Sequence, residues 1–150
     1  MTNGATSILS LDKIRLRASF DTKEAAITNA GELLVAAGHV SADYIGAMLA
    51  REQIATTYIG NGVAIPHGTR EGLAFVKSAG VSILQTPDGI DFGDGNIVRL
   101  VIGIAANGKN HMDILTSIAV VCSDDASLEK LITGDSKEEI IALLESALSQ

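Results

Sequence analysis

The run Ile97–Ala105 constrains the fold more than any other segment, because apart from Arg99 it consists of apolar residues and one glycine. A strand with one face in water alternates apolar and polar residues, whereas a continuous apolar run is typical of a strand buried on both faces. Such a strand needs helices on both sides of its sheet. Helical and strand-like segments also interleave along the chain. We therefore predict an α/β fold, with a mixed β-sheet of about five strands flanked by helices on both faces.

Local signals predict the boundaries of the other segments. Asp21 followed by Glu24 is typical of a helix N-terminus, because each side chain can accept a hydrogen bond from a free backbone N–H. The Gly-Asn-Gly sequence at 60–62 predicts a tight hairpin, since Asn and Gly tolerate positive φ. The Pro-Asp-Gly sequence at 87–89 predicts a turn. The predicted helices are 21–38, 41–53, 110–122, 128–132 and 136–148, and the predicted strands are 14–16, 56–59, 63–65, 80–86 and 97–105.

Composition and charge exclude several classes of protein. A chain of 150 residues with 47% apolar residues is expected to fold as a single domain, 1–150, with its core at about 8–148. The net charge of −7 argues against binding to nucleic acid or to an anionic membrane surface.

The single cysteine, Cys122, cannot form an internal disulfide, and its apolar helical neighbours predict a small buried residue. No apolar run is long enough to span a bilayer, and no signal peptide is recognisable. We expect a cytoplasmic protein without direct membrane insertion.

The three histidines differ in their sequence context. His39 follows the helix-ending Gly38, and we expect it to be a solvated loop or capping residue. His67 directly follows Pro66 beyond a predicted strand, where ligand sites gather in α/β sheets. A functional His67 and a simple turn histidine both fit this position. His111 falls in the first turn of a predicted helix, where it either donates a hydrogen bond to a bound anion or is a surface residue.

Arg51 lies near the end of the second predicted helix. Its guanidinium is suited to binding phosphate, but an arginine at this position also complements the helix dipole without any ligand. The sequence contains no G-x-x-x-x-G-K-[ST] phosphate loop and no G-x-S-x-G elbow. The histidines also lack the spacing of metal ligands, so we expect no metal and no cofactor. A metal-dependent hydrolase built on His67 and His111 is therefore a weak alternative.

A long string of residues resembles a known family. Arg51-Glu52, the sequence Thr-Tyr-Ile-Gly-Asn-Gly-Val-Ala-Ile-Pro-His-Gly-Thr at 57–69, His111 and the segment 114–124 are similar to the enzyme IIA domains of the mannitol/fructose class. These domains belong to the bacterial phosphoenolpyruvate-dependent sugar phosphotransferase system. The similarity extends from about Ile8 to the C-terminal Glu-Glu-Ile-Ile-Ala-Leu-Leu segment. The family fold, a mixed sheet flanked by helices, agrees with the fold predicted above.

The resemblance implies that the chain is a phosphohistidine carrier. In this family the histidine that matches His67 accepts a phosphoryl group from HPr and passes it to a cysteine of enzyme IIB. Enzyme IIB in turn serves the membrane-embedded IIC. The residues matching Arg51 and His111 hold the phosphoryl oxygens, and Asn61 and Thr69 are candidates for supporting positions. By family analogy we expect phosphorylation at Nε2, with Nδ1–H held by a backbone carbonyl.

Two readings of the resemblance remain open. Tyr58 and His111 are similar to the mannitol branch, whereas a regulatory, nitrogen-type IIA module is the alternative. Met1 and the absence of a membrane-spanning segment predict a free-standing subunit. The acidic balance also suggests that HPr docks on an acidic rim around His67, for which Asp91 and Asp94 are the candidates.

Overall fold

A computed structural model describes residues 8–148 and contains one five-stranded mixed sheet with the order β1-β4-β5-β3-β2. β1 pairs with β4 and β3 with β5 in parallel, while β4 pairs with β5 and β2 with β3 antiparallel. This arrangement confirms the predicted α/β fold. The strands are β1 (Ile14–Arg15), β2 (Tyr58–Gly60), β3 (Val63–Ala64), β4 (Gly80–Asp91) and β5 (Ile97–Ala105), and the α-helices are α1 (Lys23–Ala36), α2 (Asp43–Ile54), α3 (Gly108–Cys122), α4 (Asp125–Thr133) and α5 (Lys137–Leu148).

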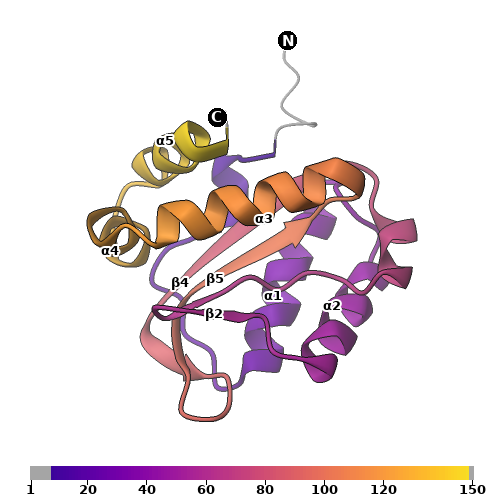
Figure 1. Cartoon of the computed structure of the whole chain (residues 1–150), viewed down its shortest axis with the longest axis horizontal. Coiled ribbons are helices and arrows are strands. Elements are labelled where there is room, and N and C mark those ends of the chain that lie inside the picture. The colour runs from indigo at the N-terminus through magenta and orange to yellow at the C-terminus, as the bar shows by residue number, and fades with distance from the viewer. Residues whose placement is uncertain (1–7, 149–150) are drawn as a thin grey trace.

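Helices cover both faces of the sheet, and the apolar β5 lies between the two layers (Figure 1). α3 crosses in front of β4 and β5, with α1 and α2 behind them. On β5, Leu100, Ile102 and Ile104 belong to the core beneath α3, α4 and α5. Val101 and Ala105 belong to the core beneath α1 and α2. All five side chains are fully buried, which explains why this strand carries almost no polar residue.

The turn predicted at 87–89 is wrong, because β4 continues through these residues to Asp91. The pairing of β4 with β5 shifts its register between Gln85 and Ile90, so Pro87 falls where the ladder is irregular and its missing N–H costs no regular hydrogen bond. The chain reverses later, where the N–H of Phe92 donates to Asn96 O at 2.8 Å.

Several predicted helix starts are also shifted, and α4 begins at Asp125 rather than at 128. The first helix is capped by Thr22 rather than Asp21, since Thr22 Oγ1 accepts a hydrogen bond from Ala25 N at 3.1 Å. α3 begins at Gly108 after Asn107, rather than at Asn110. Asp21 and Thr22 are adjacent and compete for the same free N–H groups, so the choice between them depends on the direction in which the chain enters the helix.

The prediction that His39 is solvated is wrong, because its side chain is 1% exposed. Its Nε2 lies 2.5 Å from Lys13 Nζ and its Nδ1 lies 2.9 Å from Ser78 Oγ. Burial, with the charge of Lys13, lowers the pKa of His39 to about 4, and burial lowers the pKa of Lys13 to about 8. The ring fits here because Gly80 opposite has no side chain, and a Cβ at that position would overlap the imidazole.

Cys122 lies in the core beneath α3, as predicted. Burial raises the pKa of its thiol to about 11, so the reactive thiolate is scarce at neutral pH. Among residues 8–148, no helix is both long enough and apolar enough to cross a membrane.

Candidate functional site

His67 follows a short extended segment that lies alongside β5. After β3, Pro66 O accepts a hydrogen bond from Ile104 N at 2.9 Å, and His67 pairs with Ile104 in an isolated parallel bridge. The imidazole Nδ1 lies 2.9 Å from Ile65 O. A carbonyl oxygen can only accept a hydrogen bond, so Nδ1 carries the proton and Nε2 keeps its lone pair. The backbone next to His67 therefore selects the tautomer that makes Nε2 nucleophilic.

Four of the residues predicted from the sequence, Arg51, His67, Thr69 and His111, line one pocket of about 310 Å³. The His67 and His111 rings lie 5.3 Å apart between their centroids, at an interplanar angle of 65°. His111 comes from the first turn of α3, and its Nδ1 is buried without a hydrogen-bond partner among the described residues. The pocket is lined by Arg51, His67, Gly68, Thr69, Arg70, Leu73 and His111.

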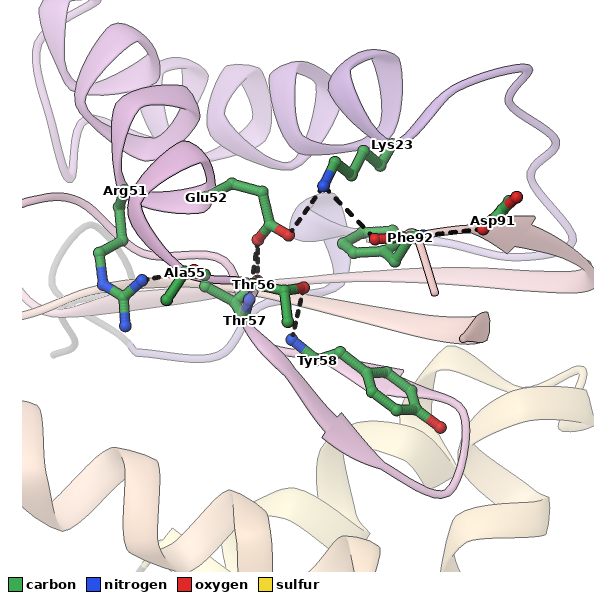
Figure 2. Close-up of polar contacts among 10 residues, drawn as sticks. Lys23, Arg51, Glu52, Ala55, Thr56, Thr57, Tyr58, Asp91 and Phe92 are labelled. Carbon is green, nitrogen blue, oxygen red and sulfur yellow. Dashed lines mark hydrogen bonds and ion pairs between the residues drawn. The ribbon is translucent and has the colours of Figure 1, made fainter. Parts of the chain in front are cut away.

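Arg51 combines the two roles that the sequence left open. Its Nη1 donates a hydrogen bond to Ala55 O at 2.6 Å, which caps the C-terminal end of α2 (Figure 2). The same guanidinium also lines the pocket. One end of the planar group is thus held by the helix, while its remaining N–H groups can bind an anion.

The electrostatic environment keeps His67 neutral. Burial lowers its pKa, and the positive charge of Arg51 lowers it further, against the opposing effect of the Ile65 carbonyl. Burial likewise lowers the pKa of His111. A neutral imidazole is the form that can act as a nucleophile, and a neutral His111 can still donate one hydrogen bond.

Tyr44 is a residue of this site that the sequence reasoning missed. Its buried hydroxyl donates to Ile104 O at 2.8 Å and accepts from Gly68 N at 2.9 Å, so it bridges β5 and the residue that follows His67. A Cβ on Gly68 would lie 2.6 Å from Tyr44 Cε1. The available signal was spacing, because Tyr44 precedes Arg51 by seven residues, which places both on one face of α2.

Replacing Gly68 by alanine is expected to displace His67, because the ring of Tyr44 is buried and cannot move aside. We expect a loss of roughly 1–3 kcal/mol in unfolding free energy, as for other overpacked sites. Gly46→Ala on α2 is the matched control, since nothing lies within 4 Å of its Cβ and alanine favours a helix by roughly 0.5–1 kcal/mol. Chemical denaturation measures both variants. A Gly68→Ala variant as stable as Gly46→Ala would contradict the tight contact.

Of the two candidates for supporting positions, Thr69 lines the pocket and Asn61 does not. Thr69 lines the pocket, and its Oγ1 accepts a hydrogen bond from Gly72 N at 3.2 Å. Asn61 instead occupies the turn between β2 and β3 with a φ of 54°, outside the set of residues that line the pocket. Its position in the matching string reflects the need for positive φ in this hairpin. Arg70, which the sequence reasoning passed over, adds a second guanidinium to the pocket.

Asp91 and Asp94 do not form a rim around His67. Asp91 pairs with Ile97 at the start of β5, whereas His67 pairs with Ile104 near the end of that strand. At about 3.3 Å per residue, the two ends lie more than roughly 20 Å apart. Asp94 follows in the turn between β4 and β5, at the same distant end. That docking hypothesis is therefore wrong for these two residues.

Comparisons with known proteins identify the family of the chain. Residues 7–147 match the family described as phosphoenolpyruvate-dependent sugar phosphotransferase system, EIIA 2. The mannitol-specific phosphotransferase enzyme IIA component of Geobacillus stearothermophilus is 48% identical over 137 residues, which cover 91% of this chain and 94% of that protein.

Two solved structures extend the comparison. The chain is similar to enzyme IIAMtl of Escherichia coli in its complex with phosphorylated enzyme IIBMtl, with a TM-score of 0.87, 40% identity and coverage of 92% and 97%. The nitrogen regulatory protein IIA-Ntr of Neisseria meningitidis gives a TM-score of 0.78, 32% identity and coverage of 91% and 96%. With its pocket histidines and the family match over nearly its whole length, the chain belongs to the EIIA 2 family of the phosphoenolpyruvate-dependent sugar phosphotransferase system and is a phosphotransferase component of that system.

Proposed function

We propose that this protein is the IIA component of a mannitol-type phosphotransferase system and acts in the cytoplasm. His67 accepts a phosphoryl group on Nε2 from the phosphohistidine of HPr and passes it to a cysteine of enzyme IIB, which is linked to the membrane component IIC. The observation that carries the proposal is the 2.9 Å contact between His67 Nδ1 and Ile65 O. It leaves the Nε2 lone pair available in a pocket that also contains Arg51 and His111.

In the first transfer, the Nε2 lone pair bonds to phosphorus while the N–P bond of the donor breaks and its electron pair stays on the donor nitrogen. The transition state spreads negative charge over three equatorial oxygens, which Arg51 and His111 stabilise by donating hydrogen bonds. Because Nδ1 keeps its proton, the phosphorylated ring of His67 is positively charged, and the Ile65 carbonyl stabilises that charge. The second transfer repeats this chemistry with a cysteine thiolate as the nucleophile and releases neutral His67.

The relatives support the mannitol assignment and the IIB partner. The Geobacillus stearothermophilus protein, named mannitol-specific, is more similar to this chain in sequence than the nitrogen regulatory protein of Neisseria meningitidis. The Escherichia coli IIAMtl structure was solved with phosphorylated IIBMtl, which supports a IIB protein as the partner of this fold.

The test is a reconstituted relay. The protein is incubated with labelled phosphoenolpyruvate, enzyme I and HPr, and a mannitol-type IIB is added afterwards. We expect an acid-labile label on this chain that moves to IIB. Failure to take up label from phosphorylated HPr contradicts the proposal. Uptake without onward transfer favours the regulatory alternative, in which the phosphorylation state of His67 controls a partner protein.

A further inference from the structure

Glu52 is a buried carboxylate next to the pocket that no step of the proposed transfer uses. Its side chain is 5% exposed, although it lies directly beside Arg51 in the sequence. Its Oε1 accepts hydrogen bonds from Thr57 N at 2.9 Å and from Thr57 Oγ1 at 2.7 Å. Its Oε2 forms an ion pair with Lys23 Nζ at 3.3 Å (Figure 2). Both oxygens are therefore held, and the carboxylate has a fixed orientation.

The hydrogen bonds continue from Glu52 to the imidazole of His67. Thr57 O accepts a hydrogen bond from Ile65 N at 3.0 Å, and Ile65 O accepts one from His67 Nδ1 at 2.9 Å. The backbone of two residues, Thr57 and Ile65, thus connects the carboxylate to the nucleophile. We propose that Glu52 is a positioning residue for His67, which acts through Thr57 and Ile65 to hold the imidazole in its Nδ1–H tautomer.

The location of these bonds explains why a carboxylate is needed. The regular pairing of β2 with β3 covers only Tyr58 to Gly60 and Val63 to Ala64, and it contains a register shift. The bond between Thr57 and Ile65 extends this short, irregular hairpin toward the catalytic end. The N–H and the hydroxyl of Thr57 both donate to Oε1 of Glu52, which holds this residue in place. Hydrogen bonds to a charged acceptor are stronger than those to a neutral one.

A carboxylate that fixes a histidine tautomer is a general device, because the hydrogen bond at one ring nitrogen decides which nitrogen carries the proton. Here the carboxylate acts through peptide groups rather than by direct contact. Removing it leaves Thr57 N without its partner and loosens the carbonyl that holds Nδ1. The Nε2–H tautomer, in which the nucleophilic lone pair is lost, then becomes populated.

The experiment compares Glu52→Ala and Glu52→Gln with Leu144→Ala, a matched control. Leu144 is fully buried on α5 and belongs to the core on the opposite face of the sheet, so its loss lowers stability without touching these hydrogen bonds. The ¹⁵N NMR shifts of the His67 ring in the unphosphorylated protein report the tautomer. The rate of phosphoryl uptake from HPr and the midpoint of chemical denaturation are measured in parallel.

We expect Glu52→Ala to populate the Nε2–H tautomer and to slow uptake by roughly 10- to 100-fold, the range found when a group that orients a metal-binding histidine is lost. Glu52→Gln keeps an acceptor oxygen but loses the charge, and it is expected to shift the tautomer measurably but less than Glu52→Ala does. Leu144→Ala is expected to lose stability but to keep the wild-type tautomer. A wild-type tautomer and rate in Glu52→Ala, with only a loss of stability, would overturn the proposal.

If Glu52→Ala does not fold, Glu52→Gln decides alone, because its weaker amide acceptor must still shift the tautomer measurably while Leu144→Ala does not. An unshifted Glu52→Gln then overturns the proposal. The inference rests on the proposed role of His67, but the NMR readout does not require phosphorylation. A shifted tautomer in a protein that accepts no phosphoryl group would disprove the transfer function and leave the positioning role standing.

Discussion

His67→Ala is expected to abolish phosphoryl uptake from HPr. The Nε2 lone pair is held free by the hydrogen bond between Nδ1 and Ile65 O, whereas the guanidinium groups of Arg51 and Arg70 only donate hydrogen bonds and cannot act as nucleophiles. The measurement is the acid-labile label that the protein takes from labelled phosphoenolpyruvate through enzyme I and HPr. We expect no label above background.

His111→Gln is the control for this experiment. The amide of glutamine can still donate a hydrogen bond to a phosphoryl oxygen, so uptake is expected to persist at a lower rate. The comparison shows which of the two histidines is the nucleophile, although the centroids of their rings lie only 5.3 Å apart. Full labelling of His67→Ala, or complete loss of label in His111→Gln with His67 intact, would exchange the roles assigned to the two histidines.

Arg51→Lys is expected to slow transfer by roughly 100-fold, which corresponds to about 2.7 kcal/mol of transition-state stabilisation. The guanidinium donates to Ala55 O at 2.6 Å and still presents further N–H groups to the pocket. A lysine ammonium is a point charge at the end of a flexible chain and cannot make both sets of contacts in a fixed plane. Single-turnover transfer from phosphorylated HPr measures the effect.

Arg99→Lys is the matched control, because Arg99 is an exposed arginine on β5 outside the pocket. It makes the same chemical change without altering the site, and we expect wild-type kinetics. Equal rates for Arg51→Lys and Arg99→Lys would show that Arg51 only caps its helix.

Much of the fold followed from local pattern. The continuous apolar run of β5 predicted helices on both faces, and the structure places Leu100 and Val101 in cores on opposite sides. The Gly-Asn-Gly hairpin also formed as predicted, with Asn61 at a φ of 54°. The prediction of a turn at 87–89 was wrong, because an irregular stretch of β4 accommodates Pro87 within the strand.

The site was predictable only in part. His67 stood out because Pro66 ends its strand segment, and the resemblance added Arg51 and His111. The sequence assigned no role to Tyr44 or Glu52, although Tyr44 lies seven residues before Arg51 and Glu52 stands in the matching string. Their roles come from contacts with Gly68 and Thr57, and spacing along the chain does not describe those contacts.

The sequence by itself determined the class of fold, the short strand that precedes His67 and the absence of an internal disulfide, because these follow from periodicity, backbone preferences and residue counts. The tertiary structure decided which distant residues meet. It buried His39 against Lys13, brought the His111 ring to His67, and placed Asp91 at the far end of β5. Burial and hydrogen bonding between distant segments depend on how the helices pack on the sheet, and the burial that results also lowers the pKa of His67.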